Sequence, residues 1–146
     1  MAHQSPTRPS YPAVGEVFEL TMGSEVTGLG LIQAFGYDPA GWTSTAKTIP
    51  AGTTQKFKFV QVGYQEDLAA VASACRQHGE VPEGVWMQVL DETFVQDGQG
   101  PVGIADPSWE RPGGDAGFPM VVSHGVRHFD WADDDRSERW RWLVAV

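Results

Sequence analysis

Alternating apolar and polar residues mark two β-strands in the first half of the chain. Residues 15–22 place apolar side chains at every second position, as in a strand with one buried face. Residues 55–63 place Phe57 and Phe59 on one side and two valines on the other. Because both sides are apolar, we expect this second strand to be central in a sheet.

Two helices are predicted after these strands. Apolar residues recur with helical spacing at Leu68, Val71, Ala72 and Cys75. Acidic residues precede this stripe, and basic residues and a glycine follow it, as is typical of helix ends. A second apolar stripe begins after Pro82, a residue suited to the first turn of a helix, and continues to Phe94.

Short strands are expected in the last third of the chain. The predicted segments are 102–105, 118–123, 127–131 and 139–146, separated by Pro, Gly and Asp clusters. Strands, then two helices, then more strands predict an α+β fold with a curved, mainly antiparallel sheet or partial β-barrel packed against a pair of helices.

The domain organisation is predicted to be simple. Residues 1–13 carry three prolines and are expected to form a flexible N-terminal arm. Residues 14–146 are then one α+β domain, a normal size for 146 residues. Within it, residues 23–54 are interrupted by Gly, Thr, Ser and Pro, and we expect a long, partly structured excursion there.

Charge and composition exclude several classes of function. The net charge of -9 and the pI near 4.7 are opposite to those of a protein that binds nucleic acid. No apolar run has the length of a membrane span, and the first residues lack a signal-peptide pattern, so we expect a soluble, cytoplasmic protein. The single cysteine, Cys75, lies on a helical apolar stripe and is predicted to be core.

A histidine-rich segment offers the strongest local chemistry. If residues 127–131 form a strand, His128 and Asp130 share one face, and His124 lies in the turn before them. Two imidazoles and a carboxylate are ligands for a divalent metal, so a small metal-dependent hydrolase is one hypothesis. No metal-site framework surrounds these residues, however, so an exposed turn His124 and an acid-paired His128 are the preferred interpretation.

Carboxylates elsewhere have structural explanations. Asp106 and Glu110 flank a tryptophan and are candidates for acid–base catalysis, but an Asp-Pro turn already accounts for Asp106. The acidic run 133–135 lacks the ligand order of a calcium loop and is expected to be a solvated turn. No nucleotide-binding or serine-nucleophile motif occurs, so no cofactor is predicted apart from the divalent metal of the hydrolase hypothesis.

Tryptophan and arginine residues are candidates for binding. Arg139 and Arg141 alternate with tryptophans in the last predicted strand, a composition found at the centres of protein interfaces. Trp109 and Trp131 are candidates for lining the mouth of a small-molecule-binding barrel.

A sequence pattern resembles a group of small uncharacterised bacterial proteins. Its segments are 100–109 (GPVGIADPSW), 118–119 (FP) and 140–144 (WRWLV), with 14–20 (VGEVFEL) at the start. The resemblance implies a bacterial origin and one intact domain, and it implies no activity and no catalytic residue.

Three functional hypotheses remain. The leading one is a non-enzymatic protein-interaction module, an adaptor or an immunity- or inhibitor-like binder, because the chain is small, acidic and rich in tryptophan and lacks a strong catalytic motif. The alternatives are the metal-dependent hydrolase and the small-molecule-binding barrel. The expected partner is accordingly another protein or a small-molecule ligand, not nucleic acid or membrane, and no pattern specifies an oligomeric state.

Overall fold

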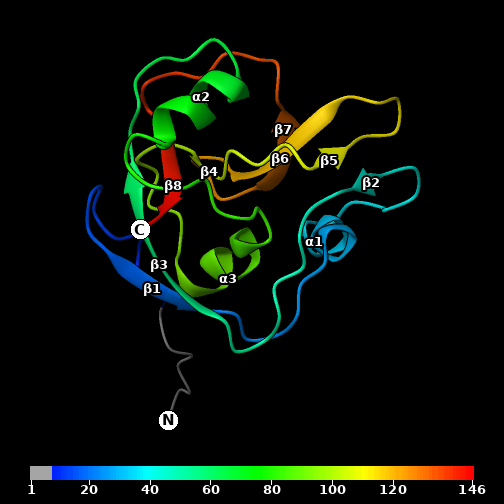
Figure 1. Ribbon diagram of the computed structural model, residues 1–146, viewed down its shortest axis with the longest axis horizontal. Helices are drawn as coiled ribbons and strands as arrows, with labels where there is room; N and C mark the ends of the chain where they lie inside the picture. The colour runs from blue at the N-terminus through cyan, green and yellow to red at the C-terminus, as the bar shows by residue number, and fades with distance from the viewer. Residues whose placement is uncertain (1–7) are drawn as a thin grey trace.

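The computed structural model describes residues 8–146, which contain three helices and eight strands (Figure 1). In chain order the elements are β1 (Phe18–Thr21), α1 (Gly28–Ala34), β2 (Thr43–Ser44), β3 (Thr54–Val60), α2 (Leu68–Cys75), α3 (Trp86–Thr93), β4 (Val102–Gly103), β5 (Trp109–Glu110), β6 (Ala116–Val121), β7 (Arg127–Trp131) and β8 (Arg141–Ala145). Across residues 8–146, no helix combines the length and the apolar character needed to cross a membrane.

The strands form one open, curved sheet in the order β1-β3-β8-β4-β6-β5-β2, with β7 paired to β6 beside this path. All neighbouring strands are antiparallel except β4 and β8, which are parallel. The predicted α+β class with a curved, mainly antiparallel sheet is confirmed. Strand β3 lies between β1 and β8, so its predicted central position is also confirmed.

Two hydrophobic clusters cover the two faces of the sheet. Phe57 and Phe59 of β3 belong to the larger cluster, whereas Val60 belongs to the smaller one. Helices α1 and α3 bury their apolar residues in the larger cluster, and α2 buries its own in the smaller one. Figure 1 shows α2 and α3 on opposite sides of the sheet. The two predicted helices therefore pack on opposite faces of the sheet, because each supplies an apolar stripe to a face that would otherwise be exposed.

The N-terminal segment differs from the predicted flexible arm over its described part. Residues 1–7 lie outside the described residues, but Tyr11 is only 7% exposed and packs edge-on against Phe59, with ring centroids 5.4 Å apart. The amide of Val95 also donates to the carbonyl of Pro9 at 2.8 Å. The segment expected as an arm therefore contacts the domain over residues 9–11, because the aromatic side chain of Tyr11 is buried there.

Candidate functional site

The histidines and the aspartate of the metal hypothesis do not converge. His128 and Asp130 share one face of β7, as predicted, but the Nδ1 atom of His128 lies 2.7 Å from the hydroxyl of Tyr37. Asp130 forms an ion pair with Arg136 at 3.6 Å, and His124 is exposed in the turn before β7. Across residues 8–146, no group of three or more metal-ligating side chains is close enough to hold an ion.

Asp106 is a structural carboxylate. It is 8% exposed, and its oxygens accept hydrogen bonds from the amide of Gly84 at 2.7 Å, the amide of Ser108 at 3.2 Å and the hydroxyl of Ser108. These donors confirm the predicted Asp-Pro turn and occupy the carboxylate that an acid–base role would need. Glu110 is exposed on β5.

Trp109 does not line the mouth of a barrel. Its side chain is 1% exposed, and its indole nitrogen donates to the carbonyl of Gly28 at 2.9 Å. The sheet is open, so no barrel mouth exists for it to line. This part of the small-molecule prediction is wrong, because the turn that precedes Trp109 folds its ring under the sheet. Trp131, by contrast, is 41% exposed.

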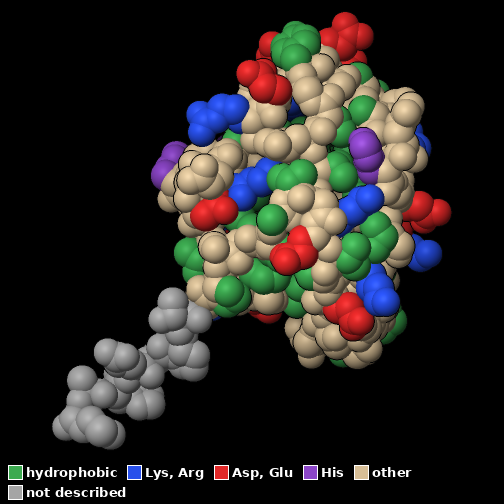
Figure 2. Space-filling model, turned by 90° about the vertical axis from the view of Figure 1, so that its left-hand side faces the viewer, with side chains coloured by type: hydrophobic (Ala, Val, Ile, Leu, Met, Phe, Trp, Pro, Cys, Tyr) green, Lys and Arg blue, Asp and Glu red, His purple; other side chains and the backbone are tan. Residues whose placement is uncertain are grey.

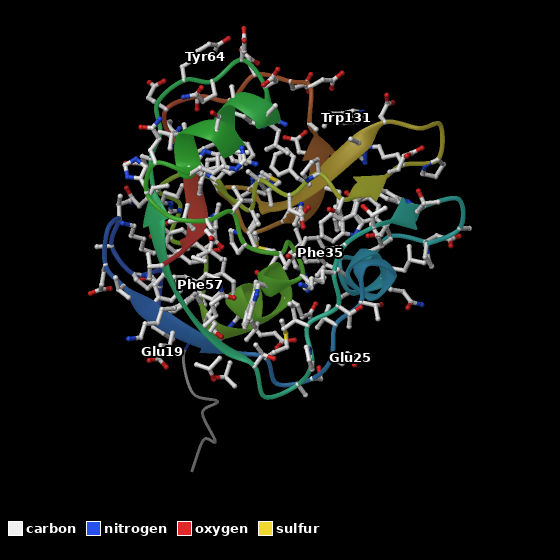
Figure 3. The ribbon with its side chains drawn as sticks, in the orientation of Figure 1. Glu19, Glu25, Phe35, Phe57, Tyr64 and Trp131 are labelled. Atoms are coloured by element: carbon white, nitrogen blue, oxygen red, sulfur yellow. The ribbon has the colours of Figure 1, made fainter. Side chains whose placement is uncertain are left out.

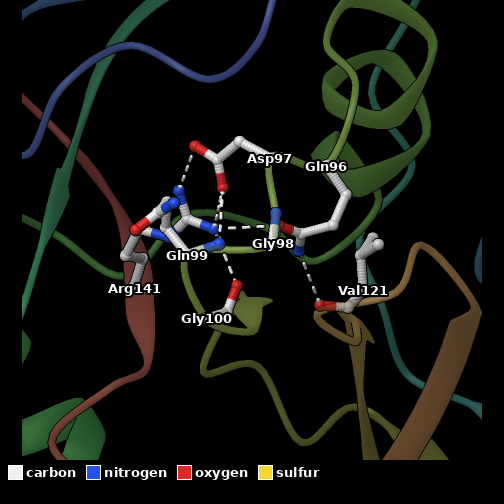
Figure 4. Close-up of polar contacts among 7 residues, drawn as sticks. All are labelled: Gln96, Asp97, Gly98, Gln99, Gly100, Val121 and Arg141. Atoms are coloured by element: carbon white, nitrogen blue, oxygen red, sulfur yellow. Dashed lines mark hydrogen bonds and ion pairs between the residues drawn. The ribbon is translucent and has the colours of Figure 1, made fainter.

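Arg141 is buried rather than presented to a partner (Figure 4). Its guanidinium donates to Asp97 at 2.9 Å, to the side chain of Gln96 at 3.0 Å and to the carbonyl of Gly100 at 2.7 Å. The expectation that Arg141 contributes an exposed binding surface is therefore wrong, because the loop 96–100 folds over it. Arg139, just before β8, is exposed.

A pocket of about 390 Å³ opens beside the first turn of α2. Its apolar lining comes from Leu68, Ala69, Ala72, Ala105, Pro107 and Ala132. Its polar lining is formed by Asp67, Arg76 and Asp133. The volume lies within the range of roughly 300–1,000 Å³ that is typical of ligand pockets in proteins. The pocket is thus an apolar depression with charged groups at its edge.

Backbone hydrogen bonds position the walls of this pocket. Asp67 caps α2 by accepting from the amide of Ala70 at 2.8 Å, and the amide of Leu68 donates to the carbonyl of Ala132 at 2.8 Å. Gln65 and Arg136 exchange two backbone hydrogen bonds, at 3.0 and 2.8 Å. These bonds join the loop before α2 to the loop after β7, which are distant in sequence.

The two joined loops form a surface that we call the acidic face, defined by Tyr64, Glu66, Asp133, Asp134 and Asp135. Tyr64 is 60% exposed, and the charge of Asp135 is the main cause that raises the pKa of its hydroxyl. Figure 3 places Tyr64 at the top of the molecule, and acidic side chains gather at that end in Figure 2.

Within residues 8–146, the carboxylates of the acidic face form no ion pair, although Arg76 lines the adjoining pocket. The ion pairs found over residues 8–146 are Arg127–Asp91, Arg136–Asp130 and Arg141–Asp97. Arg136 lies in the same loop but is 3% exposed and points inward, so it does not neutralise the surface. The charge of this face is therefore available to a positively charged ligand.

The sequence predicts a solvated turn at the acidic run 133–135, but no pattern in it connects this run with Tyr64 or with α2. The only sequence signal for the acidic face was Tyr64, an aromatic residue between two polar segments. Comparisons of the chain with protein-family models, with curated proteins and with solved structures gave no match, so the resemblance to small bacterial proteins stays a prediction.

Proposed function

We propose that this protein is a non-catalytic interaction module that binds a basic segment of another protein at the acidic face and the adjoining pocket. The observation that carries the proposal is the pocket of about 390 Å³, an apolar depression whose edge carries Arg76 and the carboxylates of Asp67 and Asp133, neither of which forms an ion pair among residues 8–146. An apolar side chain of the partner fills the pocket, and neighbouring Lys or Arg residues lie against the carboxylates.

The two parts of this surface have different roles. Burial of one aliphatic side chain in the pocket contributes about 1.5–3 kcal/mol, which makes the pocket the anchor. Each exposed charge pair contributes only about 0.2–1 kcal/mol, but several together accelerate association with a basic partner. The exposed ring of Tyr64 adds a surface for cation–π contact. The net charge of -9 also favours a basic partner over an acidic one for the molecule as a whole.

Three fluorescein-labelled peptides test this function: a lysine-rich peptide with one central leucine, the same peptide with glycine in its place, and a glutamate-rich peptide with the leucine. Anisotropy titrations should rank the leucine-containing basic peptide first, by about tenfold over the glycine peptide. The affinity should fall with salt, since screening acts within about 8 Å at physiological ionic strength. Equal binding of the acidic peptide would overturn the proposal.

A matched pair of variants links the binding to the pocket. Ala69 lines the pocket, whereas Ser73 lies exposed one turn further along α2 and does not line it. Ala69→Trp should abolish the preference for leucine over glycine, and Ser73→Trp should preserve it. Loss of the preference in both variants, or in neither, would contradict the assignment of the pocket.

A small-molecule ligand is the second candidate, and the volume of the pocket favours it. A thermal-shift screen of small metabolites tests this candidate. A stabilising compound that Ala69→Trp no longer binds, in a protein that binds none of the peptides, would establish the small-molecule function instead.

A further inference from the structure

Arg111, the residue that follows β5, lies between two tryptophan rings. Its guanidinium carbon is 4.2 Å from the ring centre of Trp131 and 5.2 Å from that of Trp42. One terminal nitrogen donates to the carbonyl of Phe129. The side chain is thus held by aromatic contacts and one hydrogen bond.

Arg136 is a second arginine in nearly the same setting. Its guanidinium lies over the rings of Phe118 and Trp140, at 4.9 and 5.4 Å, and donates to the carbonyl of Trp131. It is more deeply buried, it donates a further hydrogen bond to the carbonyl of Asp135 at 2.7 Å, and the carboxylate of Asp130 stands 3.6 Å away and balances its charge. Arg111 lacks such a carboxylate partner among residues 8–146.

No carboxylate of the protein lies within ion-pair distance of Arg111 over residues 8–146. Residues 1–7 contain no Asp or Glu, so they cannot supply one. The Nε atoms of Arg111, Arg136 and Arg141 are all buried without a hydrogen-bond partner, so the absent carboxylate is what distinguishes Arg111 from the other two. A guanidinium that is partly removed from water and not paired loses solvation without compensation. The missing interaction is that of a planar acceptor, which a carboxylate provides with two parallel hydrogen bonds.

We propose that Arg111 and Trp131 form a binding site for a small monocarboxylate that carries a flat apolar group. The ligand carboxylate forms an ion pair with Arg111, as Asp130 does with Arg136, and the flat group lies against the indole of Trp131, which is 41% exposed. A monoanion is preferred over a dianion such as phosphate because the protein carries a net charge of -9. This site is separate from the pocket beside α2.

Benzoate, acetate and inorganic phosphate, at matched ionic strength, are the probes for this site. The readout is the indole N–H resonance of Trp131 in two-dimensional NMR, assigned by its loss in Trp131→Phe. Benzoate should shift this resonance in a saturable way, at lower concentration than acetate, and phosphate should leave it unchanged. An unshifted resonance with benzoate at tens of millimolar, or a stronger response to phosphate, would overturn the proposal.

Variants separate the proposed site from general anion effects. Arg111→Gln should weaken benzoate binding by about tenfold or more, the usual effect of removing a charged hydrogen-bond donor. Arg139→Gln removes an exposed arginine that lies outside both this site and the pocket beside α2, and it should leave the titration unchanged. Arg111→Lys keeps the charge in case the first variant does not fold, and it should still weaken binding because lysine lacks the planar pair of donors. Unchanged affinity in both Arg111 variants would refute the site.

Discussion

Replacement of Arg141 by methionine tests how the loop 96–100 is held to the sheet. The substitution keeps an unbranched apolar stem but removes every hydrogen bond shown in Figure 4 between this side chain and the loop. Removal of one partner of a buried ion pair costs about 3–5 kcal/mol. Asp97 can regain water, since its side chain is 24% exposed, but the carbonyl of Gly100 accepts in a buried position. We therefore expect a loss of about 3 kcal/mol, at the lower end of that range.

Urea denaturation measures this loss. With an m-value of about 2 kcal/mol per molar, the midpoint of unfolding should fall by about 1.5 M. Arg139→Met is the matched control, because Arg139 is exposed and forms no ion pair among residues 8–146, and its midpoint should stay nearly unchanged. A loss below about 1 kcal/mol in Arg141→Met would refute the reasoning, since an interaction that small is typical of an exposed pair.

The pH dependence provides a second check on the same interaction. Burial acts to raise the pKa of Asp97, but hydrogen bonds from Arg141 and from the amide of Gln99 outweigh it, so the pKa is lowered. A carboxylate with a lowered pKa in the folded state contributes stability above its unfolded pKa of about 3.9, and this contribution is lost as the pH falls through the folded pKa. The difference in unfolding free energy between the wild type and Arg141→Met should therefore shrink below about pH 4. A difference that grows with acidity would contradict this assignment.

Two further substitutions and one labelling reaction have defined outcomes. Gly84→Ala should destabilise the fold by about 1–3 kcal/mol, because the new Cβ would stand 2.5 Å from the ring of Trp109; an unchanged melting temperature would contradict this packing. Tyr11→Ala should cost about 3 kcal/mol in urea denaturation, since a buried ring against Phe59 is lost, whereas a flexible arm would tolerate it. Burial raises the pKa of Cys75 to about 12, so iodoacetamide at pH 8 should label it only after unfolding; rapid labelling of the native protein would refute its burial.

Local patterns were sufficient to predict the elements whose burial follows a regular period. The alternation in β3 and the stripe of α2 each match their buried residues. Helix α1 could not be predicted, because its sequence GLGLIQA contains two helix-weakening glycines. Tertiary packing explains it: a Cβ at Gly28 would stand 2.2 Å from the hydroxyl of Ser44, so only glycine fits where β2 crosses.

Contacts between distant segments explain why the site was predicted only in part. The sequence correctly placed His128 and Asp130 on one face of β7, but Tyr37 and Arg136 are their actual partners. No periodicity connects residues 91 positions apart, such as Tyr37 and His128. The pocket likewise depends on the pairing of Gln65 with Arg136, which only the folded backbone shows.

The unpaired edge of β7 bears on the behaviour of this protein at high concentration. Strand β7 pairs only with β6, and an exposed strand edge is a template for the addition of strands from other molecules. On β7, however, the carbonyls of Phe129 and Trp131 already accept from Arg111 and Arg136. A second chain that approached this edge would find both acceptors occupied and the partly exposed guanidinium of Arg111 in its path. The same arginines that contact the aromatic rings thus leave this edge with fewer free acceptors for a strand of another molecule.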